Sequence, residues 1–361
     1  MNITDLGWSP FFEKNFGPYQ EDGLRPGRVV RVDRSGWRVQ SDTGAVSCSL
    51  SGKLRYTESA SGLPTVGDWV VISGDGSGGQ GLIVSVLPRQ TAVSRKAAGS
   101  GERADEQVLA ANVDTVFIVT DLDKDFNPRR IERYLALVSE SGAVPAIVLN
   151  KADECTDIGP LLNKVEVVAP GVDVFIVSAL TGMGMDQLSS FWSPGHTGVM
   201  MGSSGVGKST LINRLLGEQA QETGAIREHD GRGRHTTSHR ELVLLPDGCI
   251  LIDTPGLREI QLWVSSESIS NVFGDIEKLS ENCRFRDCQH KGEPGCAVEA
   301  AIESGDIDHS RLSSYHKLGR EQKRLEARQN GTEKHLRKIQ GKKMARMINE
   351  VKKIKKDKLQ R

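Results

Sequence analysis

One octapeptide, GSSGVGKS at residues 202–209, constrains the fold of this chain more than any other feature. It follows an apolar run at 198–201 and precedes the helical sequence TLINRLLG. The pattern G-x-x-x-x-G-K-[ST] thus has its required strand–loop–helix context. In that context, glycines let backbone N–H groups turn onto phosphate oxygens, and the helix N-terminus adds a positive dipole end. The octapeptide predicts a phosphate-binding loop in an α/β domain; a chance glycine-rich turn is the alternative.

The side chains of this loop and of a second motif predict a site for a nucleotide with Mg²⁺. We expect Lys208 to reach the β- and γ-phosphates and the Ser209 hydroxyl to bind Mg²⁺. The second motif is DTPG at 253–256, after the apolar run CILI; Asp253 would hold the same Mg²⁺ and the Gly256 N–H would meet the γ-phosphate. The predicted contacts of the loop are Gly202, Ser203, Ser204, Gly205, Val206, Gly207, Lys208, Ser209 and Thr210.

A third motif, NKAD at residues 150–153, predicts that the base is guanine. It follows the apolar run AIVL. Asp153 offers two coplanar acceptors to the N1–H and N2 amino groups of guanine, a pair of donors that adenine lacks. We expect Lys151 to lay its methylenes over the base and Asn150 to tie this loop to the phosphate side.

SAL at residues 178–180 again ends an apolar strand-like run. Here Ser178 would contact the nucleotide, and the Ala179 N–H would donate to the guanine O6. Each short motif alone is weak, since NKAD can simply open a helix. Two such motifs at strand ends beside a phosphate loop favour a guanine nucleotide.

The length and spacing of the apolar runs divide the chain into predicted domains. Five Val- and Ile-rich runs lie between residues 28 and 87, which fits a small OB-type barrel; a different small barrel or a sandwich is the alternative. From residue 116 apolar strands alternate with helical stretches, which indicates a parallel α/β sheet covered on both faces. The predicted parts are an N-terminal extension (1–23), the barrel (24–93), a nucleotide domain that opens with a Gly/Ser/Lys-rich linker (94–267), a cysteine-rich domain (268–329) and a basic tail (330–361).

Four residues near the C-terminus, spaced C-x4-C-x-H-x5-C, predict a zinc site. Cys283, Cys288, His290 and Cys296 supply three thiolates and one imidazole, which is a full tetrahedral set. Because no position stays open for water, one zinc ion there would be structural. The other cysteines are scattered, and we expect them to be core residues: Cys48, Cys155 and Cys249.

Charge is unevenly distributed although the net charge is zero. Residues 311–361 hold 18 lysines and arginines against 5 acids, so this end carries +13 and the remaining chain −13. Such a basic helical tail is typical of a segment that binds a polyanion; a solvated helix is the alternative. No apolar run reaches membrane-spanning length and residues 1–20 lack the features of a secretory signal, so we expect a cytoplasmic protein without membrane insertion.

The order of the motifs differs from the common GTPase arrangement, in which the phosphate loop comes first. Here NKAD and SAL precede GSSGVGKS and DTPG, as in a cyclically shifted sheet, which is tolerated when the old termini lie close together. Further segments are VGDWV (66–70), SRKAAG (94–99), EQVLAANVD (106–114) and CRFRDCQH (283–290). With them, the chain over about residues 24–320 closely resembles the RsgA (YjeQ) ribosome-biogenesis family of circularly permuted GTPases.

The resemblance implies a multidomain fold with an OB-type β-barrel, a circularly permuted α/β P-loop GTPase domain and a helical zinc-binding domain that leads into the basic tail. It implies hydrolysis of GTP to GDP and phosphate, stimulated by the small (30S) ribosomal subunit with its 16S rRNA, late in the maturation of that subunit. We expect a monomer. The competing interpretations are an rRNA-binding assembly scaffold in which GTP is mainly structural, and a tail that anchors to membrane surfaces.

By the same resemblance, GRGRHTT at 231–237 is the first switch segment. Thr237 would close on Mg²⁺ and the γ-phosphate, with Thr236 as the alternative. An RNA-facing basic loop is the alternative to the switch assignment, and one loop can serve both roles. Many GTPases carry a water-orienting glutamine after the DxxG glycine, whereas this chain has Leu257. We therefore expect a low intrinsic rate and a need for an external partner. His235 is the candidate for orienting water, and a plain loop histidine is the alternative.

Overall fold

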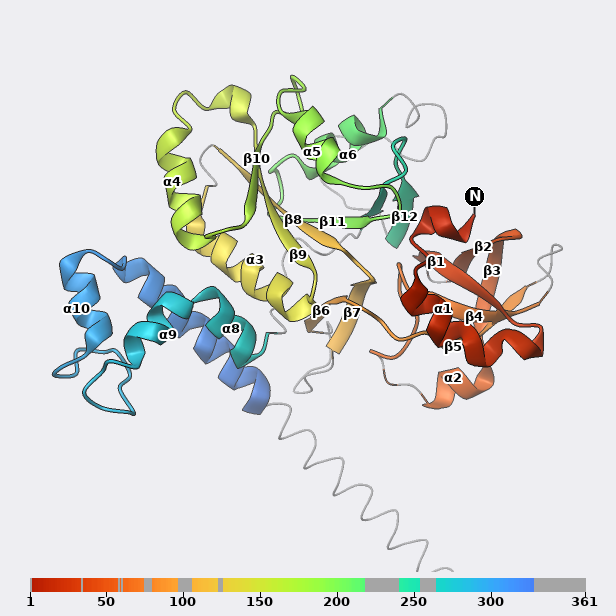
Figure 1. The fold of residues 1–361 in the computed structure, drawn as a ribbon, viewed down its shortest axis with the longest axis horizontal. Helices are drawn as coiled ribbons and strands as arrows, with labels where there is room; N and C mark the ends of the chain where they lie inside the picture. The colour runs from red at the N-terminus through yellow and green to blue at the C-terminus, as the bar shows by residue number, and fades with distance from the viewer. Residues whose placement is uncertain are drawn as a thin grey trace, which may run out of the picture.

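The computed structural model describes residues 2–33, 35–57, 59, 61–74, 80–96, 106–122, 126–217, 240–253 and 264–327. These residues form an N-terminal barrel, a central α/β sheet and a C-terminal group of helices (Figure 1). Their order along the chain is the one that the sequence predicts. The domain bounds given above remain predictions, and the basic tail lies outside the described residues.

The N-terminal barrel has five strands. They are β1 (Arg25–Asp33), β2 (Gly36–Ser41), β3 (Gly44–Leu50), β4 (Trp69–Ser73) and β5 (Gly81–Val86), with helix α2 (Gly52–Thr57) between β3 and β4. The order β1-β2-β3-β5-β4 closes because β4 pairs back onto β1, and only β3 and β5 run parallel. Inward residues such as Val29, Val39 and Ile83 fill the interior. This closed five-stranded topology confirms the OB-type prediction.

The first residues of the chain pack onto the barrel. Two 3₁₀ helices, η1 (Ile3–Leu6) and η2 (Gly17–Asp22), flank helix α1 (Pro10–Phe16). Leu6, Phe12 and Phe16 are buried, and the Phe12 ring lies 5.7 Å from the ring of Trp69. The segment treated as an extension in the sequence thus covers apolar surface that the barrel would otherwise expose to water.

The central sheet is parallel except at one edge. Its strands are β8 (Thr115–Asp121), β9 (Val144–Asn150), β10 (Asp173–Ile176), β11 (Thr197–Met201), β12 (Arg240–Leu244) and β13 (Ile250–Asp253). The order is β10-β9-β8-β11-β13-β12, with β12 antiparallel to β13. The connecting helices are α3 (Pro128–Ser141), α4 (Gly159–Val168), α5 (Met185–Phe191) and α6 (Lys208–Leu216). Every residue of β8 and β11 is buried, as expected for strands covered on both faces.

The barrel and the central sheet share hydrogen bonds. Strand β12 pairs with β13 on one side and with β1 of the barrel on the other, so that eleven strands form one sheet. Beside them, β6 (Ala92–Lys96) and β7 (Glu106–Ala111) form a two-stranded sheet. The linker predicted from residue 94 therefore begins inside a strand, because Ser94 pairs with Val108 rather than with solvent.

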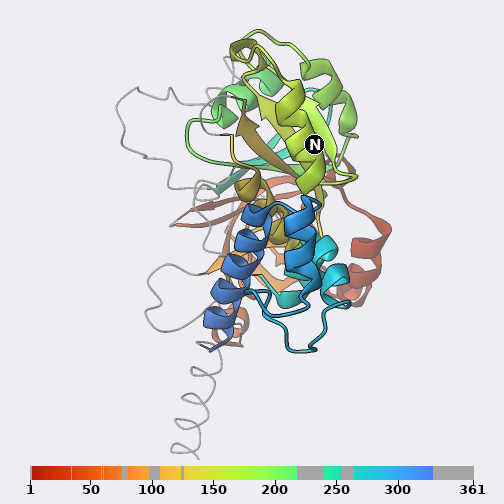
Figure 2. The ribbon, with the colours of Figure 1, turned by 90° about the vertical axis from the view of Figure 1, so that its left-hand side faces the viewer.

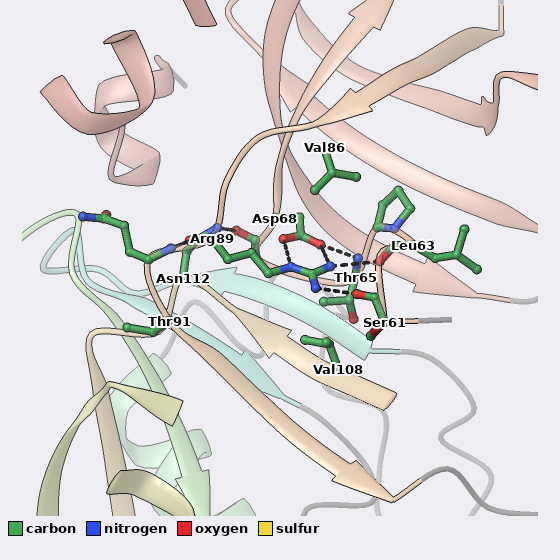
Figure 3. A network of polar contacts seen from close by, with 12 residues as sticks. Ser61, Leu63, Thr65, Asp68, Val86, Arg89, Thr91, Val108 and Asn112 are labelled. Carbon is green, nitrogen blue, oxygen red and sulfur yellow. Dashed lines mark hydrogen bonds and ion pairs between the residues drawn. The ribbon is translucent and has the colours of Figure 1, made fainter. Parts of the chain in front are cut away.

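A buried ion pair holds the loop at the base of the barrel (Figure 3). Asp68 receives two hydrogen bonds from Arg89, at 2.7 and 2.8 Å, and a third from the Thr65 backbone at 2.7 Å. Arg89 also donates to the carbonyls of Ser61 and Leu63. The pair is thus fully hydrogen-bonded, as a buried charge must be to remain favourable.

A second buried arginine, Arg28, joins three segments. It donates to the backbone carbonyls of Leu6, Gly67 and Asn112. Its guanidinium lies 5.6 Å from the centre of the Trp69 ring. Burial lowers the pKa of Arg28 to about 10, so the group keeps its charge at neutral pH.

The C-terminal helices pack along α3. They are α8 (Ser266–Val272), α9 (Gly274–Ser280), α10 (Ala297–Ser304) and a helix over 309–327. Figures 1 and 2 show these helices against the face of α3 that points away from the sheet. Among the described residues, no helix is both long enough and apolar enough to cross a membrane.

We predict that Asp68→Ala lowers the free energy of unfolding by about 3 kcal/mol, because removal of the buried carboxylate leaves the half-buried Arg89 charge without its anionic partner. The control is Asp33→Ala, whose carboxylate pairs with Arg31 at 3.5 Å on the surface; we expect less than about 1 kcal/mol there. Urea denaturation followed by tryptophan fluorescence measures both. Equal effects of the two substitutions would contradict the importance given to this pair.

Candidate nucleotide and metal sites

The motifs of the sequence meet at one edge of the central sheet. Strands β8, β9, β10, β11 and β13 run parallel, so their carboxyl ends share that edge. Asn150 ends β9, Asp253 ends β13, and the glycine-rich loop follows β11 at Gly202. Loops at the carboxyl ends of parallel strands are where such sheets bind ligands. The fold therefore places the predicted phosphate, base and Mg²⁺ residues together.

The glycine-rich loop has a backbone that only glycine allows. Gly205 and Gly207 have φ values of 88° and 92°, in the left-handed region. A Cβ at Gly202 would lie 2.2 Å from the Val119 carbonyl oxygen, and one at Gly207 would lie 2.2 Å from Asn150 Nδ2. Helix α6 begins at Lys208, and the Lys208 ammonium donates to the carbonyls of Gly202 and Ser203. This is a formed phosphate-type loop with its lysine folded over it.

Asn150 connects the base-type loop to the phosphate-type loop. Its side-chain Nδ2 donates to the Val206 carbonyl at 2.9 Å, and its Oδ1 accepts from the Ala179 N–H at 3.1 Å. One buried amide thus joins NKAD, SAL and the glycine-rich loop. The Ala179 N–H, which the sequence assigns to the guanine O6, has Asn150 as its partner in this structure. The buried Ser178 hydroxyl accepts from the Thr181 N–H and orders the same turn.

Lys151 is held in an unusual backbone conformation. Its φ is 63° and its ψ is 38°, in the left-handed region that a lysine seldom adopts. Its ammonium pairs with Asp121 Oδ2 at 3.2 Å, while Asp153 is exposed. Asp121 was not among the residues predicted from the sequence. The signal that could have found it is an acidic residue at the end of the apolar run that precedes the run ending in NKAD.

Arg130 is a second residue that the sequence did not single out. It lies in the first turn of α3, and its Nη1 donates to Ser203 Oγ in the glycine-rich loop at 2.6 Å. No local sequence pattern predicts this contact, because the two residues lie 73 positions apart in the chain.

Several predicted residues lie outside the described part of the chain. They are His235, Thr236, Thr237, Gly256 and Leu257. Of the predicted Mg²⁺ ligands, Ser209 lies in the first turn of α6 and Asp253 is exposed at the end of β13. The functional edge therefore presents two of the three predicted Mg²⁺ ligands among the described residues.

The predicted metal ligands come together in the C-terminal helices. The ligand atoms of Cys283, Cys288, His290 and Cys296 all lie within 4.8 Å of one another. Cys283 Sγ is 3.7 Å from His290 Nδ1 and 4.0 Å from Cys296 Sγ, and His290 Nδ1 is 3.4 Å from Cys296 Sγ. A tetrahedron with Zn–S near 2.3 Å and Zn–N near 2.0 Å has edges of about 3.5–3.8 Å. The cluster can therefore hold one metal ion of that size.

Within the cluster, Cys283 is the cysteine whose surroundings favour the thiolate. Burial raises the pKa of Cys283, but hydrogen bonds from the backbone N–H groups of Ala297 and Val298 outweigh this effect, so its pKa lies below the usual value. Cys48 and Cys249 are instead buried in the core, where burial raises their pKa to about 11 and about 12. Cys155 packs half-buried against the core, so the three scattered cysteines lie where we expected them.

This strand order and this order of motifs define a circularly permuted P-loop GTPase. A family model described as RsgA GTPase matches residues 86–263. A protein named small ribosomal subunit biogenesis GTPase RsgA, from Opitutus terrae, is 46% identical over 332 residues, which cover 89% of this chain and 90% of the relative. The chain belongs to the RsgA GTPase family.

Further relatives agree with this assignment. Small ribosomal subunit biogenesis GTPase RsgA 2 from Vibrio parahaemolyticus is 47% identical over 89% of this chain and 86% of its own. The crystal structure of YjeQ from Thermotoga maritima matches 83% of this chain and 98% of its own, with a TM-score of 0.59 and 28% identity. A second family model, ABC transporter, matches residues 185–358. That range contains the P-loop, which many nucleotide-hydrolysing classes share.

We predict one bound metal ion per chain in protein purified without added metal. Cys288→Ser should lose the ion and destabilise the C-terminal helices, because metal binding and local folding are coupled. Cys155→Ser, outside the cluster, should keep the ion. Elemental analysis measures both variants, and full metal content in the Cys288 variant would show that the ligand set is wrong.

Proposed function

We propose that this protein hydrolyses GTP and acts in the biogenesis of the small ribosomal subunit. The observation that carries the proposal is the contact from Asn150 to Val206, which joins a guanine-type loop to a phosphate-type loop at one sheet edge. The names of relatives that match nearly the whole chain supply the partner, since they are small ribosomal subunit biogenesis GTPases.

Guanine recognition would rest on the loops that Asn150 holds together. Asp153 is exposed and offers its carboxylate to the N1–H and N2 amino groups. The Lys151 stem would cover the base while Asp121 holds its ammonium. Ser178 and Ala179 would close the site from the neighbouring strand. The Ala179 N–H would then share its hydrogen between Asn150 and the guanine O6, or exchange one for the other.

The phosphates would lie on the glycine-rich loop, over the backbone N–H groups of residues 202–210. Lys208 would leave the carbonyls that it contacts here and turn to the β- and γ-phosphate oxygens. Mg²⁺ would be held by Ser209, Asp253 and Thr237, and would neutralise charge that develops on the phosphates. The common edge of β11 and β13 supports the first two assignments.

The intrinsic rate would be low. Leu257 follows the DTPG glycine, and its side chain can neither accept nor donate a hydrogen bond to the attacking water. The Gly256 N–H would contact the γ-phosphate, and His235 would orient the water when the partner orders its loop. A GTPase built in this way depends on its partner for turnover, which suits a protein that monitors an assembly.

We assign the metal of the C-terminal cluster as zinc. Three cysteines and one histidine are ligands that zinc prefers, and the separations among Cys283, His290 and Cys296 lie close to the edges of its tetrahedron. The four side chains fill every position, so zinc would stabilise these helices and take no part in hydrolysis.

The partner surface would be 16S rRNA. Residues 311–361 carry a net charge of +13. Neutralisation of phosphates by lysine and arginine is a main source of affinity for RNA. With a ribosomal partner, the protein would act in the cytoplasm. We propose that it acts as a monomer.

The test is GTP turnover with and without purified small ribosomal subunits. We expect the subunit to raise kcat by at least about tenfold, because it would complete a site that lacks a water-orienting glutamine. Large subunits are the matched control and should not stimulate. If small subunits bind the protein but leave turnover unchanged, the chain is a scaffold in which GTP is structural.

We predict that Asp153→Asn weakens GTP binding by more than about tenfold, since charge-assisted hydrogen bonds to guanine are worth about 2–3 kcal/mol. The same change should improve binding of xanthosine nucleotides, because xanthine has an oxygen where guanine has an amino group. Fluorescence titration with labelled nucleotides measures both. Equal affinity of the unaltered protein for ATP and GTP would show that the base site is assigned wrongly.

A further inference from the structure

Helix α3 lies between the phosphate-type loop and the C-terminal helices (Figures 1 and 2). Arg130 in its first turn donates to Ser203 Oγ at 2.6 Å. Glu132, two residues later, lies about 200° further round the helix and therefore faces the other way. Within its first turns, one helix thus contacts the nucleotide loop on one side and the C-terminal helices on the other.

The contact on the second side is a cluster of charges with a buried pair, Glu132 and Arg311, at its centre. The Glu132 side chain is fully buried, and its Oε1 accepts from Arg311 Nη1 at 2.7 Å and also from Arg129. Arg311 is itself 4% exposed and makes two hydrogen bonds to the carboxylate of Asp275, at 2.7 and 2.8 Å. Because Glu132 and Arg311 are both buried, separation of these two side chains is unfavourable.

Two further contacts fix Arg311 in the C-terminal helices. Its Nη2 donates to the Val272 carbonyl at 2.9 Å, and its guanidinium lies 5.0 Å from the centre of the Phe273 ring. Arg311 therefore belongs rigidly to the C-terminal helices, and Glu132 fastens α3 to it. A displacement of the C-terminal helices must carry the N-terminal end of α3 with it.

The contact on the first side ends at the residue that the catalytic lysine touches. The Ser203 hydroxyl accepts a hydrogen bond from Arg130, and the Ser203 carbonyl oxygen accepts one from Lys208. A shift of Arg130 would therefore move the Ser203 segment of the loop, whose backbone N–H groups would lie over the phosphates once Lys208 has turned to the phosphate oxygens. Since enzyme rates respond to sub-ångström changes in the positions of reacting groups, a small shift here is enough to alter turnover.

We propose that Arg130 is a positioning residue of the phosphate loop, through which the engagement of the C-terminal helices by the ribosomal subunit is passed to the hydrolysis site. The inference rests on the proposed function, because it needs a subunit-stimulated GTPase. In this connection, the pair Glu132–Arg311 transmits a displacement of the C-terminal helices to α3, and the pair Arg130–Ser203 transmits it from α3 to the phosphate-type loop.

Four variants of the full-length, metal-loaded protein test the proposal. Arg130→Ala removes the contact to Ser203, and Arg130→Lys keeps a charge and a donor there. Glu132→Gln removes the buried charge but keeps an acceptor of the same shape. The matched control is Glu140→Gln at the far end of α3, since Glu140 also binds the C-terminal helices through the Ser265 N–H and the Ser268 hydroxyl.

For each variant, kcat and KM for GTP are measured with and without saturating small subunits, and thermal unfolding reports on folding. Arg130→Ala should lower the stimulated kcat by about tenfold and change KM by less than about threefold, as expected for loss of one charge-assisted contact that acts on rate. Arg130→Lys should recover most of this loss. Glu132→Gln should lower stimulation by a similar factor with its basal rate within about twofold, and Glu140→Gln should behave like the unaltered protein.

The double variant Arg130→Ala/Glu132→Gln decides whether the two sites form one connection. If they do, the double variant loses no more stimulation than Arg130→Ala alone. If the two losses multiply, or if Arg130→Ala keeps full stimulation, the proposal is wrong. Absence of stimulation in the unaltered protein would instead overturn the proposed function, so the two failures are distinguishable. Where Glu132→Gln unfolds, Arg311→Lys with the same measurements replaces it.

Discussion

The nucleotide edge of this protein depends on one buried amide. Asn150 donates to the Val206 carbonyl and accepts from the Ala179 N–H, so three loops from three strands are held by a single side chain. Because the amide is buried, loss of either hydrogen bond would leave a polar group without a partner, which costs more than the bond itself stabilises. The strands deliver the loops to one edge, and Asn150 sets the distance between the base side and the phosphate side.

Around that edge, direct contacts connect the barrel, the central sheet and the C-terminal helices. Strand β12 hydrogen-bonds both to β13, which ends at Asp253, and to β1 of the barrel. On the other side α3 reaches from Ser203 to the buried cluster of Glu132 and Arg311. A partner bound by the barrel or by the C-terminal helices would therefore act on elements that touch the nucleotide edge. This continuity suits an enzyme whose turnover reports on a large partner.

The permuted order has a physical consequence. In a parallel sheet the position of a strand, and not its place in the chain, decides which loops meet. Here β11, which carries the phosphate-type loop, lies between β8 and β13, and NKAD on β9 comes earlier in the chain. The chain after Asp253 leads into the C-terminal helices, so the DTPG motif and the metal-binding helices are neighbours along the chain.

Local patterns in the sequence determined the phosphate-type loop, the guanine-type motifs, the five-stranded barrel and the four metal ligands, because each depends on residue types at short spacing. Three features were decided only by the tertiary structure: the pairing of β12 with the barrel, the contact of Lys151 with Asp121, and the position of α3 between Arg311 and Ser203. These contacts join residues 30 to 210 positions apart. No periodicity encodes them, since they follow from how whole elements pack and from which buried charges then need partners.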